Sequence, residues 1–171
     1  MKISPTFKMP FKRRRLGKTY YNKRLKLLLS RKPRLVARKS LKYIRAQVVE
    51  FSKEGDKTLA TATSNELKKF GWGFACDNLP AAYLTGILIG KKALKKGVKE
   101  AILDSGLHVS TKGNRIYAVV KGAVDAGLKI PMDESILPAE DRIRGLHIAK
   151  HSEKFKLLPE KFDEIKKKIG G

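Results

Sequence analysis

The sequence predicts an α/β fold: a mixed sheet, in which an antiparallel meander is followed by parallel strands, with helices flanking it. Three strand-like segments with alternating side chains come first, and a strongly apolar helical segment follows them. A short apolar segment and a second helical segment then return the chain to the sheet. With 171 residues, we expect a basic arm and helix at 1–32, an α/β core at 33–131 and a helical extension at 132–171.

The first part of the chain is predicted to be an arm followed by one helix. Residues 1–18 contain two prolines and a basic block at 12–15, which indicates an extended segment that is disordered in the free protein. Thr19 is a candidate N-cap for a helix that runs to about residue 30. One face of this helix carries Tyr21, Leu25, Leu28 and Leu29, and the other carries Lys23 and Lys26. We therefore expect the helix to pack through its leucines and to present its lysines to solvent.

Pro33 ends that helix, and three strands are predicted at 34–39, 42–51 and 57–63. The second strand alternates, with Ile44, Ala46 and Val48 on one face and Tyr43, Arg45 and Gln47 on the other. Short polar links between the three segments are typical of hairpins, so an antiparallel meander is expected.

The next segments predict helix, strand and helix. Asn78 or Asp77 can cap a helix that runs to about residue 96, where a glycine closes it. A buried strand at 100–104, a helix at 114–126 and a brief strand at 129–130 form a right-handed crossover unit. Two further short helices are expected, at 139–151 and 159–169.

The charge distribution predicts a polyanionic partner. The chain has 39 Lys and Arg against 16 Asp and Glu. Seventeen of the first fifty residues are basic, and the first acidic residue is Glu50. Lys and Arg bound to phosphates release condensed counterions, which drives the binding of nucleic acid. Aromatic residues lie among these charges, at Phe7, Phe11, Tyr20, Tyr21 and Tyr43. They favour RNA, because RNA offers unpaired bases for stacking far more often than duplex DNA.

A second candidate anion site is the loop Ser110–Arg115, between a predicted strand and a helix N-terminus. Lys112 and Arg115 add charge to the free backbone amides there. Taken alone, an ordinary glycine turn with a helix cap explains this loop better. The segment Gly86–Lys92 resembles a phosphate-binding loop superficially, but its spacing is wrong and it lies within a predicted helix.

No catalytic or metal site is predicted. A nuclease of ribonuclease H type needs several carboxylates near one phosphate, whereas the first strand carries none. Asp104 and Asp125 lie on different elements, and His108 beside Asp104 is interpreted as structural. His147 and His151 are interpreted as a surface pair. The single Cys76 excludes an internal disulfide, no secretory signal is visible, and the longest apolar stretch is too short to span a bilayer.

Five longer segments carry a resemblance to a known family. They are RRRLGKTYYNKRLKLLLSRKPRLVARKS, IRAQVV, GWGFACDNLPAAYLTGILIGKKAL, EAILDSGLHVSTKGNRIYAVVKGAVDAGLKIP and DRIRGLHIAKH, and they cover most of the chain. In order and spacing the sequence resembles the large-subunit ribosomal protein eighteen family in its archaeal and eukaryotic-type form. The bacterial form stops near Ile130, so residues 131–171 mark the archaeal-type branch.

The resemblance implies a ribonuclease H-like fold without catalytic acids, and a cytoplasmic structural protein of the ribosome. Such a protein binds 5S rRNA, helps to attach it to the large subunit in the central protuberance, and contacts 23S rRNA and neighbouring ribosomal proteins. It has no cofactor, no enzymatic activity, no membrane partner and no small-molecule substrate. A histone-like DNA-binding protein and a ribonuclease H-like nuclease remain as alternatives.

The RNA-binding residues that the resemblance implies lie in the arm, the first helix and the first strand. They are Lys12, Arg13, Arg14, Arg15, Lys18, Tyr20, Tyr21, Lys23, Arg24, Lys26, Arg31, Lys32, Arg34, Arg38 and Lys39. Lys112 and Arg115 are added from the glycine loop, on the strength of its charge alone.

Overall fold

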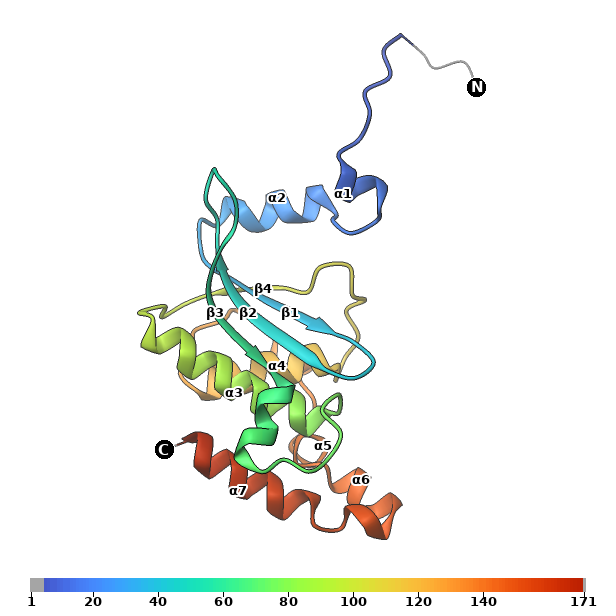
Figure 1. Ribbon diagram of the computed structural model, residues 1–171, viewed down its shortest axis with the longest axis vertical. Coiled ribbons are helices and arrows are strands. Elements are labelled where there is room, and N and C mark those ends of the chain that lie inside the picture. The colour runs from blue at the N-terminus through green and yellow to red at the C-terminus, as the bar shows by residue number, and fades with distance from the viewer. Residues whose placement is uncertain (1–4, 171) are drawn as a thin grey trace.

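The structure is a computed structural model that describes residues 5–170; residues 1–4 of the expected arm and Gly171 lie outside this range. It confirms the α/β class, with a four-stranded mixed sheet in the order β3-β2-β1-β4 (Figure 1). The antiparallel meander consists of β1 (Arg34–Lys39), β2 (Ile44–Glu50) and β3 (Lys57–Thr63). The fourth strand, β4 (Ile102–Asp104), pairs with β1 in parallel.

The register of the sheet places small and branched side chains toward the helices. Leu35 pairs with Val48 and Ala37 with Ala46, and all four are buried. The pairing of β2 with β3 contains a bulge between Val48 and Val49. The last strand expected from the sequence is an isolated parallel bridge between Glu100 and Lys129, because the chain turns away directly afterwards.

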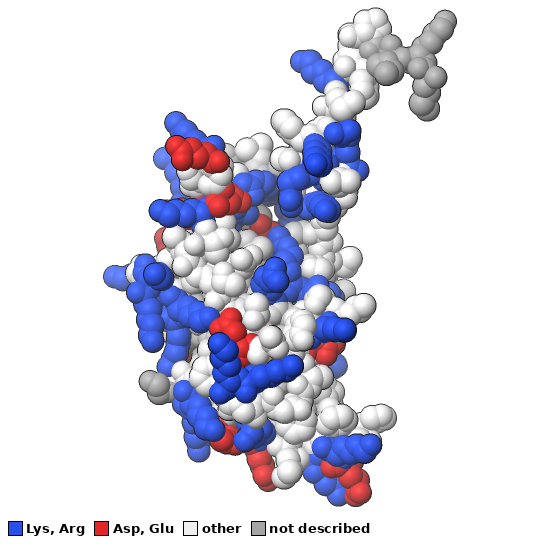
Figure 2. All heavy atoms as spheres, in the orientation of Figure 1, with Lys and Arg blue, Asp and Glu red and all other residues white. Residues whose placement is uncertain are grey.

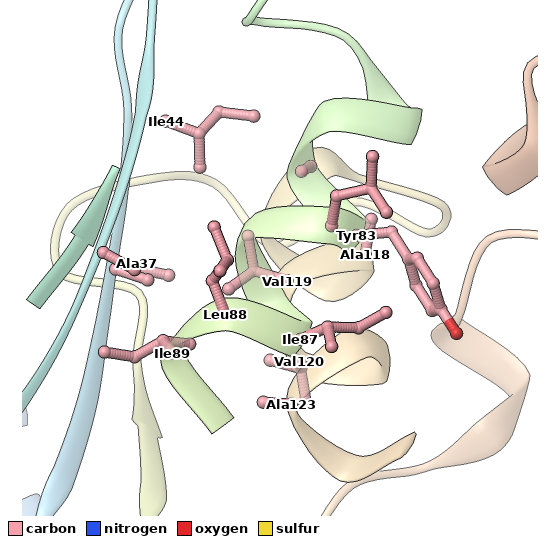
Figure 3. Packing of buried hydrophobic residues seen from close by; sticks show 14 of the residues in the cluster. Ala37, Ile44, Tyr83, Ile87, Leu88, Ile89, Ala118, Val119, Val120 and Ala123 are labelled. Atoms are coloured by element: carbon pink, nitrogen blue, oxygen red, sulfur yellow. The ribbon is translucent and has the colours of Figure 1, made fainter. Parts of the chain in front are cut away.

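Two helices cover one face of the sheet (Figure 1). The first, α3 (Leu79–Lys95), is capped by the Asn78 side chain, which accepts from the Ala81 amide at 2.9 Å. The second, α4 (Arg115–Asp125), is capped by Asn114 in the same way. Figure 3 shows side chains of both helices packed against the sheet. No helix within residues 5–170 is both long enough and apolar enough to cross a membrane.

Glycines let α3 and α4 approach closely. A Cβ on Gly86 would lie 2.2 Å from the Val119 carbonyl oxygen, and a Cβ on Gly122 would lie 2.1 Å from the Tyr83 carbonyl oxygen. Both separations are far below any van der Waals contact, and the obstacles are backbone atoms that cannot rotate away. The glycines of the segment Gly86–Lys92 therefore serve helix packing, in agreement with the rejection of a phosphate loop.

The chain also contains shorter helices that the sequence predicted only in part. The 3₁₀ segment η1 (Ser64–Phe70) was not expected, although Thr63 and Glu66 form a capping box at its start. The C-terminal part consists of η2 (Glu134–Ile136), α5 (Glu140–Arg144), α6 (Leu146–His151), η3 (Glu153–Phe155) and α7 (Leu158–Gly170).

The single helix expected at 139–151 is wrong, because Gly145 divides it into α5 and α6. Gly145 has φ +81°, and a Cβ there would lie 2.3 Å from Leu158 Cδ2. The turn lets α7 fold back onto α3, and side chains from both α5 and α7 enter the main hydrophobic core. These core side chains are Ile143, Leu158, Phe162, Ile165 and Ile169.

The N-terminal part differs from the expectation in two local ways. The basic block is not extended, because Lys12–Arg15 form one helical turn, α1. The helix α2 (Tyr21–Leu29) has Tyr20 as its N-cap, without a side-chain cap. Thr19 does not cap it, and instead accepts a hydrogen bond from Arg13 Nε at 2.8 Å.

The expected orientation of α2 is also wrong. The helix lies over the face of the sheet opposite α3 and α4 (Figure 1), and none of its residues is fully buried. Leu25 and Leu29 are 60% and 73% exposed, whereas Lys23 and Arg24 bond to groups of the α/β body. Lys23 and Arg24 turn inward because the surface beneath them offers carboxylate and carbonyl groups, whereas Lys26 stays exposed as expected.

Replacing Gly86 or Gly122 by Ala is expected to destabilise the protein strongly, since the new Cβ forces the two helices apart. Helix propensity alone would favour Ala by about 0.5–1 kcal/mol, so any loss must come from the crossing. Gly73→Ala is the control, because a Cβ at Gly73 meets nothing within 4 Å. Thermal unfolding is the measurement, and midpoints for Gly86→Ala and Gly122→Ala equal to that of Gly73→Ala would contradict the role assigned to the crossing.

Candidate nucleic-acid interface

A groove of about 600 Å³ separates α2 and the preceding arm from the open face of the sheet. Its floor comes from β1, β2 and the start of β3, and the loop after β4 closes one end. Eight of the predicted RNA-binding residues line it together: Arg13, Lys18, Tyr20, Tyr21, Lys23, Arg24, Arg34 and Arg38. The groove is thus the place where the fold gathers eight of the seventeen predicted site residues.

The floor of the groove is built around Arg34, which is only 2% exposed. Its Nη1 donates to Asp104 Oδ2 at 2.8 Å, and its Nη2 donates to Asp56 Oδ2 at 2.6 Å. One guanidinium group therefore joins β1 to β4 and to the β2–β3 hairpin. Its buried Nε meets no acceptor among residues 5–170, so the pairing is incomplete on that side.

Asp104 is held by further donors. Its Oδ1 accepts from the Gly106 amide at 2.8 Å and from Arg38 Nη2 at 3.2 Å. Burial alone would raise the pKa of this carboxyl group, but the charge of Arg38, the Gly106 amide and Arg34 outweigh burial, and the net pKa is lowered. Gly106 is required here, because it has φ +60° and a Cβ would lie 2.7 Å from Arg38 Cζ.

Ionic and polar contacts attach α2 to this floor. Arg24 forms two hydrogen bonds with the Asp56 carboxylate, at 2.8 and 2.7 Å. Lys23 donates to Ser105 Oγ at 3.0 Å and to the Gly106 carbonyl at 3.1 Å. The hydrogen bond from Arg24 is the main cause that lowers the pKa of Asp56, with Arg34 adding to it against the effect of burial. Charge therefore fixes the position of α2.

The rim of the groove carries aromatic rings and free cations. The rings of Phe11 and Tyr21 lie 5.4 Å apart at 44°, and Tyr20 is 58% exposed. Arg13 and Lys18 are exposed beside them. Figure 2 shows that Lys and Arg side chains crowd around α1 and the adjoining end of α2. Six basic and two acidic side chains line the groove, which leaves it strongly positive.

The remaining predicted residues lie outside the groove. Lys12, Arg14, Arg15, Lys26 and Arg31 are exposed on the arm and α2 side. Lys32 pairs with Glu100 at 2.7 Å, and Lys39 is half-buried at the end of β1.

The glycine loop does not join the groove. Lys112 is exposed, but Arg115 turns away to Asp77, with 3.2 Å between Nη1 and Oδ2. Asn114 caps the first turn of α4, so the loop is an ordinary turn that leads into a capped helix.

Some groove residues were not predicted as site residues. Gln47 and Thr58 supply polar groups to the floor, Val36 and Val49 supply apolar surface, and Leu107 lies at one end. The alternation of β2 places Gln47 on the face opposite Ala46, which is a signal that sequence reasoning had available. Which element would cover that face was not visible in the sequence.

The acidic side chains considered for a nuclease have other partners. Asp104 lies among arginines, whereas Asp125 accepts from the Tyr83 hydroxyl at 2.7 Å and pairs with Lys121 at 3.1 Å. Burial, with Asp125 adding to it, raises the pKa of Tyr83. Within residues 5–170, no three His, Cys, Asp or Glu side chains gather in a way that could hold a metal ion.

Comparison with known proteins gives a consistent result over nearly the whole chain. Residues 5–100 and 95–133 match a family model described as "Ribosomal large subunit proteins 60S L5, and 50S L18". The chain is 51% identical, over 190 residues, to the large ribosomal subunit protein uL18 of Methanococcus maripaludis. That alignment covers 99% of this chain and 98% of the relative, so the C-terminal helices are included.

The ion pairs of Asp104 give a prediction for stability and pH. Asp104→Asn leaves Arg34 buried with one carboxylate fewer, and we expect a loss of about 3 kcal/mol in the free energy of unfolding at pH 7. The pKa of Asp104 is lower in the folded than in the unfolded state, so its contribution is complete above the ordinary Asp pKa of about 4 and is lost as pH falls further.

Chemical denaturation from pH 7 to pH 2 measures this contribution. The difference between wild type and Asp104→Asn should shrink as pH drops below about 4. Glu54→Gln removes one exposed carboxylate and serves as the control. A difference that stays constant across the whole pH range would show that the Asp104 charge does not stabilise the fold.

Proposed function

The chain belongs to the family of ribosomal large subunit proteins 60S L5 and 50S L18, and from this premise we propose that it binds 5S rRNA and helps to attach it to the large subunit. As a member of this family it is a protein of the large ribosomal subunit. The further proposals are a place in the central protuberance, contacts with 23S rRNA and neighbouring ribosomal proteins, and the absence of a catalytic role.

One observation carries this proposal: the cationic arm and α2 form a surface that faces away from the hydrophobic core. Lys12, Arg14, Arg15, Lys18 and Lys26 are exposed and form no ion pair within residues 5–170. A folded protein gains nothing from such mutual repulsion unless a polyanion neutralises it. We infer that residues 1–32 contact RNA and that the α/β core at 33–131 holds them in position. Residues 132–170 pack on that core, and we propose that their outer surface contacts neighbouring ribosomal proteins.

We infer two different roles for the predicted site residues, because some of them form contacts within the protein and others do not. The exposed cations are free to contact phosphates. Lys23, Arg24, Arg34 and Arg38 are already engaged within the protein, and we assign them to positioning α2 and the loop after β4. The same division applies to the loop Ser110–Arg115, where Lys112 is exposed and Arg115 pairs with Asp77.

The alternatives have weaker support in the geometry. A histone-like protein requires only phosphate contacts, and it gives no reason for exposed Tyr20 and the Phe11–Tyr21 ring pair beside a groove. A nuclease requires carboxylates that are free to act, whereas Asp56 and Asp104 are bonded to arginines.

Filter binding across salt concentrations tests the function. The full-length protein should bind 5S rRNA more tightly than duplex DNA of equal length at each salt concentration, and it should leave both intact when Mg²⁺ is present. Equal affinity for the two nucleic acids would favour the histone-like alternative. Mg²⁺-dependent cleavage would favour the nuclease.

Changing Arg13, Arg14 and Arg15 together to Ala should weaken 5S rRNA binding and flatten its salt dependence. Each lost phosphate contact reduces the slope of log K against log salt by about 0.7 to 0.9. The control is Lys95, Lys96 and Lys99 together to Ala, which removes the same charge from exposed positions near the C-terminal end of α3. Equal slopes for the two triple variants would refute the phosphate role of α1.

A further inference from the structure

We propose that the groove between α2 and the sheet takes up one unstacked nucleotide of the bound RNA, with its base against the sheet and its phosphate on the cations of the rim. This inference rests on the proposed RNA-binding function and adds to it a defined subsite. Binding by exposed cations alone would follow the RNA backbone without taking up a base. The groove adds space for a base, an apolar surface beneath it and polar groups at its edge.

The size and depth of the groove suit a single nucleotide. Its volume of about 600 Å³ lies within the range of pockets that bind small organic molecules. The Arg34 contacts join β1 to β4 and to the β2–β3 hairpin, and Arg24 and Lys23 attach α2 to them, so the groove is already formed in the protein without RNA. A preformed site avoids the entropy cost of ordering loops on binding.

The lining of the groove matches the parts of a nucleotide. Val36 and Val49 offer an apolar surface to the flat face of a base, and the Tyr20 and Tyr21 rings flank the opening. Gln47 makes only a long hydrogen bond, from Nε2 to Thr61 Oγ1 at 3.4 Å, so its amide can turn to a base edge with both a donor and an acceptor. Thr58 is exposed and adds a hydroxyl group beside it.

The electrostatics of the groove favour the phosphate of that nucleotide. Arg13 and Lys18 are exposed at the rim, where a phosphate can reach them. The two acidic side chains of the groove would repel an anion if they were free. They are instead neutralised by Arg34, Arg24 and Arg38, so the groove attracts phosphate although it contains carboxylates.

The first experiment uses mononucleotides and the full-length protein. Backbone and Gln47 side-chain amide signals are followed by NMR during titration with AMP, GMP, CMP and UMP, and separately with inorganic phosphate. We expect saturable shifts of Gln47 and Val49 with at least one nucleotide, and weaker effects of phosphate. Equal shifts with phosphate alone would show a simple anion site and overturn the proposal, as would no shift at these residues.

The second experiment fills the groove. Thr58→Trp places a large ring in it, and Leu41→Trp is the control, since Leu41 is 94% exposed in the β1–β2 turn and lies outside the groove. Thr58→Trp should weaken 5S rRNA binding by roughly tenfold, the scale of one lost stacked base. Leu41→Trp should bind like wild type, and equal unfolding midpoints would show that both variants fold.

The outcomes separate this inference from the proposed function. If wild type binds 5S rRNA specifically but Thr58→Trp binds it equally well, the groove is not used and the proposed function stands. If wild type itself shows no preference for 5S rRNA, the proposed function fails. If Thr58→Trp loses stability, Gln47→Ala replaces it, and unchanged RNA affinity in that variant overturns the groove proposal.

Discussion

The buried guanidinium group of Arg34 is the constraint on which the N-terminal half of the molecule depends. It binds carboxylates from two elements that are distant in sequence, Asp56 in the β2–β3 hairpin and Asp104 at the end of β4. Removing one of these carboxylates would leave the buried charge of Arg34 with only one of its two ionic partners. The parallel pairing of β1 with β4 and the position of the hairpin are thus linked through one side chain.

The same contacts set the position of α2 on the sheet. A buried ion pair often adds little net stability compared with apolar packing, and exposed pairs add less still. The benefit of the Arg24 and Lys23 contacts is therefore geometric. They keep the aromatic and cationic side chains of α2 beside the sheet, while Leu25 and Leu29 stay exposed and a groove remains between the helix and the strands.

Sequence reasoning succeeded where a local signal, such as a helix cap or an alternating strand, matches the packing of the hydrophobic core. The cap at Asn78 and the alternation of β2 identified α3 and the sheet, because each of these signals depends only on neighbouring residues. It failed for α2, whose leucines predict packing only if an apolar surface lies opposite. The surface that lies opposite is instead charged, and it is formed by Asp56, Arg34 and Asp104, which the chain brings together from three separate segments. The site residues were named from the family resemblance, with Lys112 and Arg115 added from their charge, but their division into free and engaged groups depends on these long-range contacts.

The net positive charge of the groove decides whether it suits a metal ion or a phosphate group. Two carboxylates in a cleft could in principle hold a divalent cation and activate water. Here each carboxylate accepts hydrogen bonds from two arginines, and six cations surround the pair, so the local potential repels a metal ion and attracts phosphate. Because Arg34 stands on the first strand between the two acids, both carboxylates are engaged in ion pairs and the groove suits an anion.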